Sequence, residues 1–260
     1  MGTGQYIYET GAGSDTGVVR DHNEDSYLTK PESGVWVVAD GMGGHEAGDF
    51  ASQTIVERIS SIGRPASAPD LQARFMERLT RAHDLIVEQS QALGGATIGA
   101  TLVALLAHED LFACIWSGDS RIYLLRNGEF NQVTRDHTEV QELLNSGAIT
   151  EEQAEHWPRK NVITRAIGVS QSPNTDETFG SLEAGDVFLL CSDGLTEHVE
   201  DHEMATVLKS HDPQAACDAL IETTLSRGAR DNVTVIVVRC SARPQNPVEA
   251  EEPLDWTQGF

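Results

Sequence analysis

The sequence predicts an α+β sandwich, and two features of it carry this prediction. Short apolar, β-branched segments follow one another with tight turns between them, as strands of antiparallel sheets do. Two long helical segments stand together between the early strands. A doubly wound parallel sheet would instead alternate strands and helices, so the pattern favours the sandwich.

The N-terminal part contains the first strands and a glycine-rich loop. Residues 5–10 and 17–19 are expected to be early strands. Residues 35–39 are all apolar and predict a buried strand that ends at Asp40. The loop Gly41-Met42-Gly43-Gly44 follows this strand directly.

Two helices are expected next. In the first, over about 46–62, apolar residues recur every three or four positions: Ala47, Ala51, Ile55, Ile59 and Ile62. Pro65 and Pro69 then break the chain, and Asp70 is expected to cap a second helix that runs to about Leu93. Its apolar stripe includes Leu71, Phe75, Leu79, Leu85 and Ile86.

The middle of the chain predicts a strand meander and then a polar insertion. The meander has four strands, at 101–107, 111–116, 121–125 and 130–133, and Asn127-Gly128 forms a hairpin turn because both residues tolerate positive φ. Residues 137–172 are polar and are expected on the surface, with short helices at Glu139–Asn145 and near 150–156.

The remaining core elements are a strand at 187–191, helices near 201–209 and 213–226, and a strand at 233–239. From Ser241 onward, three prolines and an acidic run predict a disordered tail over 241–260.

Composition excludes several classes of protein. A net charge of -23 argues against binding to nucleic acid or anionic membranes, which requires a basic surface. No apolar run approaches the roughly 20 residues of a membrane span, and no signal peptide is expected at the N-terminus. The four cysteines form no Cys-x-x-Cys pair and are expected to be reduced core thiols, which favours the cytosol.

Acidic residues stand at the ends of the apolar runs. They are Asp40, Asp119, Asp193 and Asp231. One such residue alone is usually part of a turn, but four predict a shared rim, and a rim of carboxylates is costly unless cations compensate it. Oxygen ligands without Cys or His suit Mg²⁺ or Mn²⁺. The segment Arg20–Asp25 adds Glu24 and Asp25, and a guanidinium that can bind two phosphate oxygens.

Competing motifs are weaker. Asp21, Asn23, Asp25 and Glu32 have calcium-loop spacing, but Ser26 replaces the glycine that this loop requires. Gly11-x-Gly13-x-x-x-Gly17 is followed by Val18-Val19-Arg20 instead of the helix of a dinucleotide site. No zinc-peptidase or serine-hydrolase motif is present.

Five ordered motifs resemble the metal-dependent serine/threonine protein phosphatases of type 2C, and Met-Gly-Gly-His resembles their bacterial branch. The motifs are Arg20-x-x-x-Glu24-Asp25, Asp40 to His45, Gly118 to Arg121, Ser192 to Leu195 and Asp231-Asn232. This resemblance implies a central sandwich of two antiparallel sheets in an α-β-β-α arrangement. It also implies a catalytic domain over 1–240, with 137–172 as a flap beside the active site.

The resemblance also implies roles for single residues. Asp40 would bridge two ions, Asp193 and Asp231 would complete the first, and Glu24 with the Gly41 carbonyl would hold the second. Arg20 would bind the substrate phosphate. Asp25 would orient metal-bound water, and Asn232 would support Asp231. A third ion would use Asp119 and Asp193, with Glu197 where the family usually has aspartate. Met42 replaces a histidine that eukaryotic relatives use as general acid, and His45 is expected to cap or pack, so metal-bound water would protonate the leaving group.

The expected activity is hydrolysis of phosphoserine or phosphothreonine by direct attack of a hydroxide that bridges two Mn²⁺ or Mg²⁺ ions. Phosphorylated proteins, and a bacterial serine/threonine kinase of the eukaryotic-like type or its targets, are the expected partners of a cytoplasmic monomer. The alternatives are a phosphatase-like regulatory or binding module without turnover, and a phosphatase of small metabolites. Trp157 and Trp256 are expected in local packing or in partner contacts.

Overall fold

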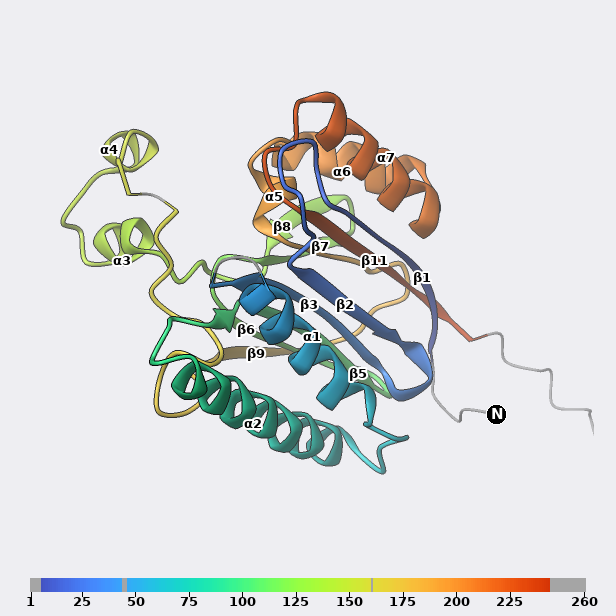
Figure 1. Ribbon diagram of the computed structural model, residues 1–260. Coiled ribbons are helices and arrows are strands. Elements are labelled where there is room, and N and C mark those ends of the chain that lie inside the picture. The colour runs from blue at the N-terminus through green and yellow to red at the C-terminus, as the bar shows by residue number, and fades with distance from the viewer. Residues whose placement is uncertain (1–5, 44–45, 160, 244–260) are drawn as a thin grey trace, which may run out of the picture.

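The computed structural model describes residues 6–43, 46–159 and 161–243, and it contains two antiparallel sheets packed face to face between helices (Figure 1). The first sheet has the order β2 (Asp25–Lys30), β3 (Val35–Met42), β5 (Leu102–His108), β6 (Leu111–Ser117) and β9 (Asp176–Ser181), and β4 (Gly99–Ala100) also pairs with β3. The second has the order β1 (Tyr6–Asp15), β11 (Val233–Ala242), β10 (Val187–Cys191), β7 (Arg121–Arg126) and β8 (Glu129–Gln132). The predicted sandwich is confirmed.

Helices cover the outer face of each sheet (Figure 1). The first sheet is covered by α1 (Glu46–Ser60) and α2 (Ala68–Ala92), and the second by α6 (Asp201–Ser210) and α7 (Pro213–Ser226). The chain therefore has the expected four layers. The short helices η1 (Pro31–Ser33) and α5 (Asp193–Thr196) were not expected from the sequence.

The strand β3 shows why the central segments are apolar throughout. Val35, Val37 and Ala39 pack with α1 and α2, whereas Trp36 and Val38 pack between the two sheets. All five are fully buried, because the strand has no face toward water. A third apolar cluster lies between the second sheet and α5, α6 and α7. Continuous burial on both faces makes such strands visible in a sequence.

Some of the strand predictions from the sequence were wrong. Residues 17–19 form a turn instead of a strand, since Gly17 has a φ of +78° and Val18 and Val19 are 60% and 64% exposed. The expected strand at 5–10 is longer and continues to Asp15. Strands β2 and β9 were missed because each has partly exposed, mixed polar positions instead of an apolar run.

The start of α2 also differs from the prediction. Ser67, not Asp70, is the N-cap, and its hydroxyl accepts a hydrogen bond of 3.2 Å from the Asp70 N–H. Asp70 lies in the first turn, where its carboxylate accepts from the Ala66 N–H and from Arg74. Ser67 and Asp70 both stand near the start of this helix, and both residue types are good caps, so composition alone did not distinguish the cap from its neighbour.

The predictions for the C-terminal tail and for the polar insertion can be compared with the structure only in part. The predicted tail was to begin at Ser241, but β11 includes Ser241 and Ala242, and residues 244–260 lie outside the described residues. The polar insertion contains α3 (Glu139–Asn145) and α4 (Glu151–Glu155), which project from the body of the molecule (Figure 1).

The four cysteines are buried and form no disulfide, as expected. In the described part of the chain, none of the helices combines the length and the apolar character that a membrane crossing requires.

We expect Ser67→Ala to lower the free energy of unfolding by about 1 kcal/mol, because α2 would lose its side-chain cap. Urea denaturation would measure this change. Ser60→Ala at the exposed end of α1 is the matched control and should stay within a few tenths of a kcal/mol. An equal effect of both substitutions would contradict the assignment of the cap.

Candidate active site

The predicted acidic residues converge at one end of the sandwich, where strands of both sheets terminate. In the first sheet, Asp25 begins β2 and lies opposite Asp40 near the end of β3. In the second sheet, Asp193 follows β10 and Asp231 precedes β11, and the antiparallel register of these strands puts both at the same end. Four carboxylates from distant segments of the chain thus meet on one rim.

Ser192 joins the two sheets at this rim. Its hydroxyl donates a hydrogen bond of 2.8 Å to Asp25 Oδ2 and accepts one of 2.9 Å from the Thr234 N–H. The residue is fully buried. Sequence reasoning read Ser192 only as part of the Ser-Asp-Gly motif and missed that it positions Asp25.

Thr101 fixes the backbone of Asp40, and no feature of the sequence indicated this. The two residues exchange hydrogen bonds, since the Asp40 N–H donates to Thr101 Oγ1 at 3.2 Å and the Thr101 N–H donates to the Asp40 carbonyl at 2.8 Å. Thr101 Oγ1 also lies 2.7 Å from Ser120 Oγ. Through this pair of hydroxyls, the Asp40 strand is tied to the segment that contains Asp119.

Asn232 holds the loop that contains Glu24. Its side-chain oxygen accepts a 2.8 Å hydrogen bond from the Glu24 N–H, and its amide donates to the carbonyls of Thr16 and His22 at 2.9 Å each. The Asn232 backbone N–H donates to Asp231 Oδ1. The contacts of the side chain therefore support Glu24 as well as the start of β11.

Two glycines bring Glu24 close to the end of β3. A Cβ atom at Gly41 would lie 2.2 Å from the Gly48 carbonyl oxygen and 2.7 Å from that of Glu24. A Cβ atom at Gly48 would lie 2.5 Å from the Glu24 carboxylate. Side chains at either position would push β3, α1 and Glu24 apart, so both glycines are required by close packing.

The crowding of carboxylates raises their pKa values. Burial, followed by repulsion from Asp25, Asp193, Asp119 and Asp231, holds the pKa of Asp40 well above its ordinary value. The pKa of Asp193 is raised in the same way. Burial raises the pKa of Asp25 to about 6, although the hydrogen bond from Ser192 opposes the shift. The cluster therefore favours any species that adds positive charge, a proton or a cation.

These residues fit a pair of hard divalent cations. The donors are carboxylate oxygens, which Mg²⁺ and Mn²⁺ prefer. Asp25 Oδ1 is buried and has no hydrogen-bond partner among the described residues. Among the described residues, no three Asp, Glu, His or Cys side chains lie close enough together to hold one metal ion. Arg20 donates a 2.6 Å hydrogen bond to Asp231 Oδ2, so the Asp231 carboxylate is paired with a guanidinium.

A cleft beside this rim contains the residues expected at a third ion. Asp119, Asp193 and Glu197 line it, and its volume is about 730 Å³. Burial raises the pKa of Asp119 to about 6, with repulsion from Asp136 as the next cause. Asn161 of the polar insertion also lines this cleft and donates a 2.7 Å hydrogen bond to Glu197. Sequence reasoning missed Asp136, which Arg121 binds with two nitrogens.

Met42, the last residue of β3, stands directly after Asp40-Gly41, where the sequence analysis considered a histidine as proton donor. A thioether has no proton to donate. His45, the other candidate from the sequence, lies outside the described residues.

Comparison with known proteins identifies relatives over most of the chain. Residues 13–230 match the family described as Protein phosphatase 2C. The chain is 37% identical to the serine/threonine phosphatase stp of Listeria welshimeri, over 86% of this chain and 93% of that protein. It is 38% identical to the serine/threonine protein phosphatase PstP of Mycobacterium tuberculosis, over 87% of this chain and 44% of that protein.

Solved structures with the same arrangement include the following two proteins. PppA of Pseudomonas aeruginosa, described as a key regulatory component of T6SS, has a TM-score of 0.84 and 42% identity, over 90% of this chain and 97% of that one. The catalytic domain of a serine/threonine protein phosphatase PstP, in complex with two manganese ions, has a TM-score of 0.82 and 34% identity, over 91% of this chain and 99% of that one.

The raised pKa of Asp40 predicts a pH-dependent gain in stability on Asp40→Asn. A carboxylic acid with a raised pKa in the folded state costs stability as pH rises from its unfolded pKa through its folded pKa. In chelator, Asp40→Asn should therefore unfold at a higher temperature than the wild type at pH 8, and at nearly the same temperature as the wild type at pH 4.

Thermal melts at both pH values, with and without Mn²⁺, would measure this effect. Asp84→Asn on the exposed face of α2 is the control and should change neither melt. The stabilisation of the wild type by Mn²⁺ should be largely lost in Asp40→Asn. A variant that melts below the wild type in chelator at pH 8 would show that the carboxylates do not repel one another.

Proposed function

This chain belongs to the protein phosphatase 2C family, and we propose that it removes phosphate from phosphoserine and phosphothreonine of protein substrates with the help of divalent cations. The observation that carries the proposal is the meeting of Asp25, Asp40, Asp193 and Asp231 on one rim, with Arg20 beside it. Curated relatives that are serine/threonine phosphatases over nearly their whole length support it.

We assign two ions to the side chains of Glu24, Asp40, Asp193 and Asp231 and to the carbonyl of Gly41. When bound, such ions lower the pKa of a water molecule and polarise the phosphoryl group. The relative solved with two manganese ions supports Mn²⁺, and the same oxygen donors suit Mg²⁺. A third ion would use Asp119, Asp193 and Glu197, which line one cleft.

Arg20 is proposed to bind the phosphate of the substrate. Its side chain is 49% exposed and ends beside Asp231, so it can reach both the rim and the solvent. Release from Asp231 would free a planar guanidinium for two phosphate oxygens, while the carboxylate would become available to a cation. Breaking the Arg20–Asp231 ion pair would thus make Arg20 available to the substrate phosphate and Asp231 available to a cation.

Asp25 is proposed to orient the attacking water. Ser192 holds one of its oxygens at 2.8 Å, and the other, Oδ1, is buried with no hydrogen-bond partner in the described part of the chain. That oxygen remains an acceptor for a water proton. Because Thr234 in turn holds Ser192, the carboxylate keeps one orientation on the rim.

The cysteines provide no nucleophile for a covalent mechanism. Cys191 is the one beside the rim, immediately before Ser192, and burial raises its pKa to about 12. A thiol with this pKa is protonated at neutral pH and is a poor nucleophile. The surroundings of the rim therefore favour direct attack by water on phosphorus.

The wider assignments are inferences of the same proposal. We place the catalytic domain in residues 1–240 and its flap in residues 137–172, where Asn161 donates a hydrogen bond to Glu197. The substrates would be phosphorylated by a bacterial serine/threonine kinase of the eukaryotic-like type. Four buried, unpaired thiols support a cytoplasmic location.

Hydrolysis of an aryl phosphate should require Mn²⁺ or Mg²⁺ and stop on addition of a chelator. Asp193→Asn should lower kcat by at least about 100-fold, because a charge that holds a cation is lost. Steady-state kinetics with each ion would measure this loss. Asp84→Asn is the control with the same change of charge far from the rim. Turnover near the wild-type rate in Asp193→Asn would refute the assignment.

Arg20→Lys should raise KM for a phosphopeptide by roughly 10- to 100-fold, since one ammonium cannot replace two charge-assisted hydrogen bonds. Arg81→Lys, at an exposed position of α2, should leave KM unchanged. Initial rates on phosphopeptides and on small phosphorylated metabolites would be compared in both variants. An unchanged KM in Arg20→Lys would show that this side chain does not contact the phosphate.

A further inference from the structure

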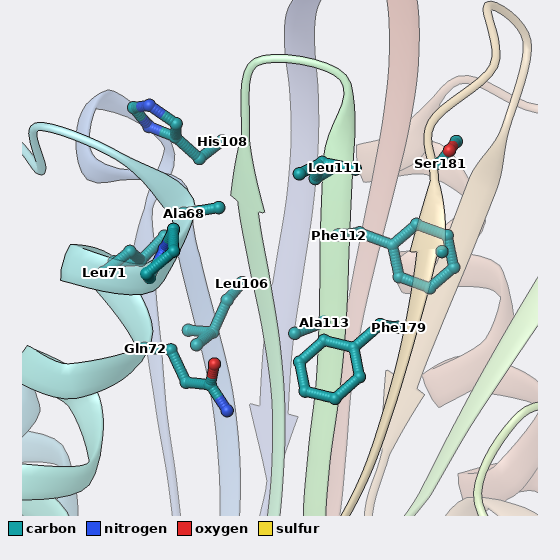
Figure 2. Close-up of a pocket in the computed structure, with 12 residues that line it drawn as sticks. Ala68, Leu71, Gln72, Leu106, His108, Leu111, Phe112, Ala113, Phe179 and Ser181 are labelled. Carbon is teal, nitrogen blue, oxygen red and sulfur yellow. The ribbon is translucent and has the colours of Figure 1, made fainter.

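An apolar groove lies at the end of the first sheet opposite the acidic rim (Figure 2). Its walls come from Leu71 of α2, Leu106 of β5 and Phe179 of β9, and its volume is about 380 Å³. Leu106 pairs with Val35, the first residue of β3, whereas Asp40 stands near the end of that strand. The length of the strand therefore separates the groove from the rim.

Large apolar side chains in this groove are exposed to water. Phe179 is 58% exposed and Leu111 is 45% exposed. The register pairs Phe179 with Ala113, whose small side chain leaves the space beside the ring open. At the inner end, Gln72 donates a 2.8 Å hydrogen bond to Glu177 and closes the gap between α2 and β9. An apolar hollow on an edge strand is a surface that proteins usually cover.

The chain leaves the described fold next to this groove. After β11 ends at Ala242, Arg243 lines a second hollow together with Arg64 and His108. His108 also lines the apolar groove, so the two hollows adjoin. Residues 244–260 follow, and 17 residues can span up to about 56 Å when extended. The C-terminal segment is long enough to reach every part of the groove.

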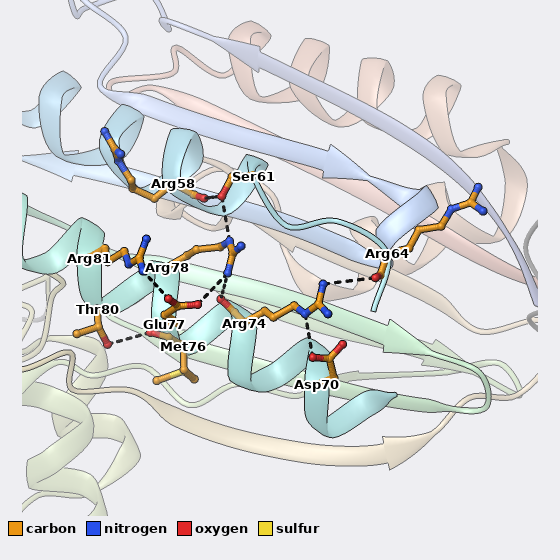
Figure 3. A network of polar contacts seen from close by, with 10 residues as sticks. All are labelled: Arg58, Ser61, Arg64, Asp70, Arg74, Met76, Glu77, Arg78, Thr80 and Arg81. Atoms are coloured by element: carbon orange, nitrogen blue, oxygen red, sulfur yellow. Dashed lines mark hydrogen bonds and ion pairs between the residues drawn. The ribbon is translucent and has the colours of Figure 1, made fainter. Parts of the chain in front are cut away.

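The C-terminal segment and the helices beside the two hollows carry opposite charges. The C-terminal segment has four acidic residues and no Lys or Arg. The chain has only 18 Lys and Arg residues, and five arginines gather on α1, α2 and the loop between them (Figure 3), namely Arg58, Arg64, Arg74, Arg78 and Arg81.

The carboxylates nearby neutralise only part of this arginine patch. Arg74 pairs with Asp70, and both Arg78 and Arg81 pair with Glu77. Arg58 and Arg64 have no carboxylate within ion-pair distance in the described part of the chain. In the second hollow, Glu32 and Glu109 offset the charges of Arg64 and Arg243, so the excess of positive charge lies on the rest of the arginine patch.

We propose that the C-terminal segment 244–260 docks on this face of its own chain. Leu254 and Trp256, two positions apart, point to the same side of an extended chain and fill the groove beside Phe179. The preceding carboxylates of Glu249, Glu251 and Glu252 lie along the arginine patch. Docking covers the exposed ring of Phe179 and leaves the acidic rim at the opposite end of the sheet open.

Hydrogen–deuterium exchange on the full chain tests this proposal. The double substitution Leu254→Ser and Trp256→Ser should speed amide exchange in residues 68–72 and 176–181 by roughly tenfold, because local protection there depends on the docked segment. Phe179→Ser should speed exchange of the segment itself. Leu93→Ser is the control, since Leu93 is 54% exposed and follows the far end of α2.

Two further readouts separate docking from misfolding. Turnover of an aryl phosphate should be unchanged in Phe179→Ser, which would show that the variant folds. In 0.5 M salt, and in Arg64→Glu, protection of the segment should decrease, as screening or reversal of charge predicts.

Three results would overturn the proposal. The first is equal exchange of residues 68–72 and 176–181 in the wild type and the double variant. The second is protection by the segment of a different face. The third is protection that grows with protein concentration, which would place the segment on a second copy of the chain instead.

Discussion

Repulsion among like charges is the constraint on which the acidic rim depends. Asp40 stands within the field of Asp25, Asp119, Asp193 and Asp231, and burial raises the cost of each negative charge. Neutral hydroxyl groups of neighbouring residues fix the positions of two of these residues. Ser192 holds Asp25, and Thr101 holds the backbone of Asp40. The scaffold thus orients Asp25 and Asp40 without neutralising them, and a site of this kind is suited to divalent cations.

The cost of the rim is carried by the core behind it. Three buried apolar clusters lie between the four layers, and strands such as β3 and β10 have apolar side chains on both faces. Burial of this surface stabilises the fold by far more than a few crowded carboxylates destabilise it. Functional sites commonly lower the local stability of a protein, and here the core of the sandwich offsets this loss.

The two ends of the first sheet have opposite character. One end carries the carboxylates, and the other carries the apolar groove. Because both ends belong to the same strands, the core between them fixes their distance. Chemistry on phosphate and contact with another segment of chain can therefore be separated on one small scaffold. The separation also explains why a substitution at Phe179 and one at Asp193 should have independent effects.

The sequence by itself determined the fold class, the buried central strands and the identity of the acidic residues. Continuous apolar runs such as 35–39 and 187–191 were correctly predicted as buried strands, because they are too short for a typical helix and rich in β-branched or aromatic residues. The ordered acidic motifs identified the family, and the comparisons agree with that identification. Their roles as metal ligands remain proposals.

Only the tertiary structure decided the contacts that bring distant residues together. Strand β9 exists because β6 offers it an edge, although its own residues are mixed in polarity. Ser192 and Asp25 are 167 positions apart, and no local pattern predicts a hydrogen bond between them. The same holds for Ser67 as the cap of α2 and for the groove beside Phe179. Local sequence encodes which side chains are buried, whereas the packing of sheets and helices decides which polar groups meet.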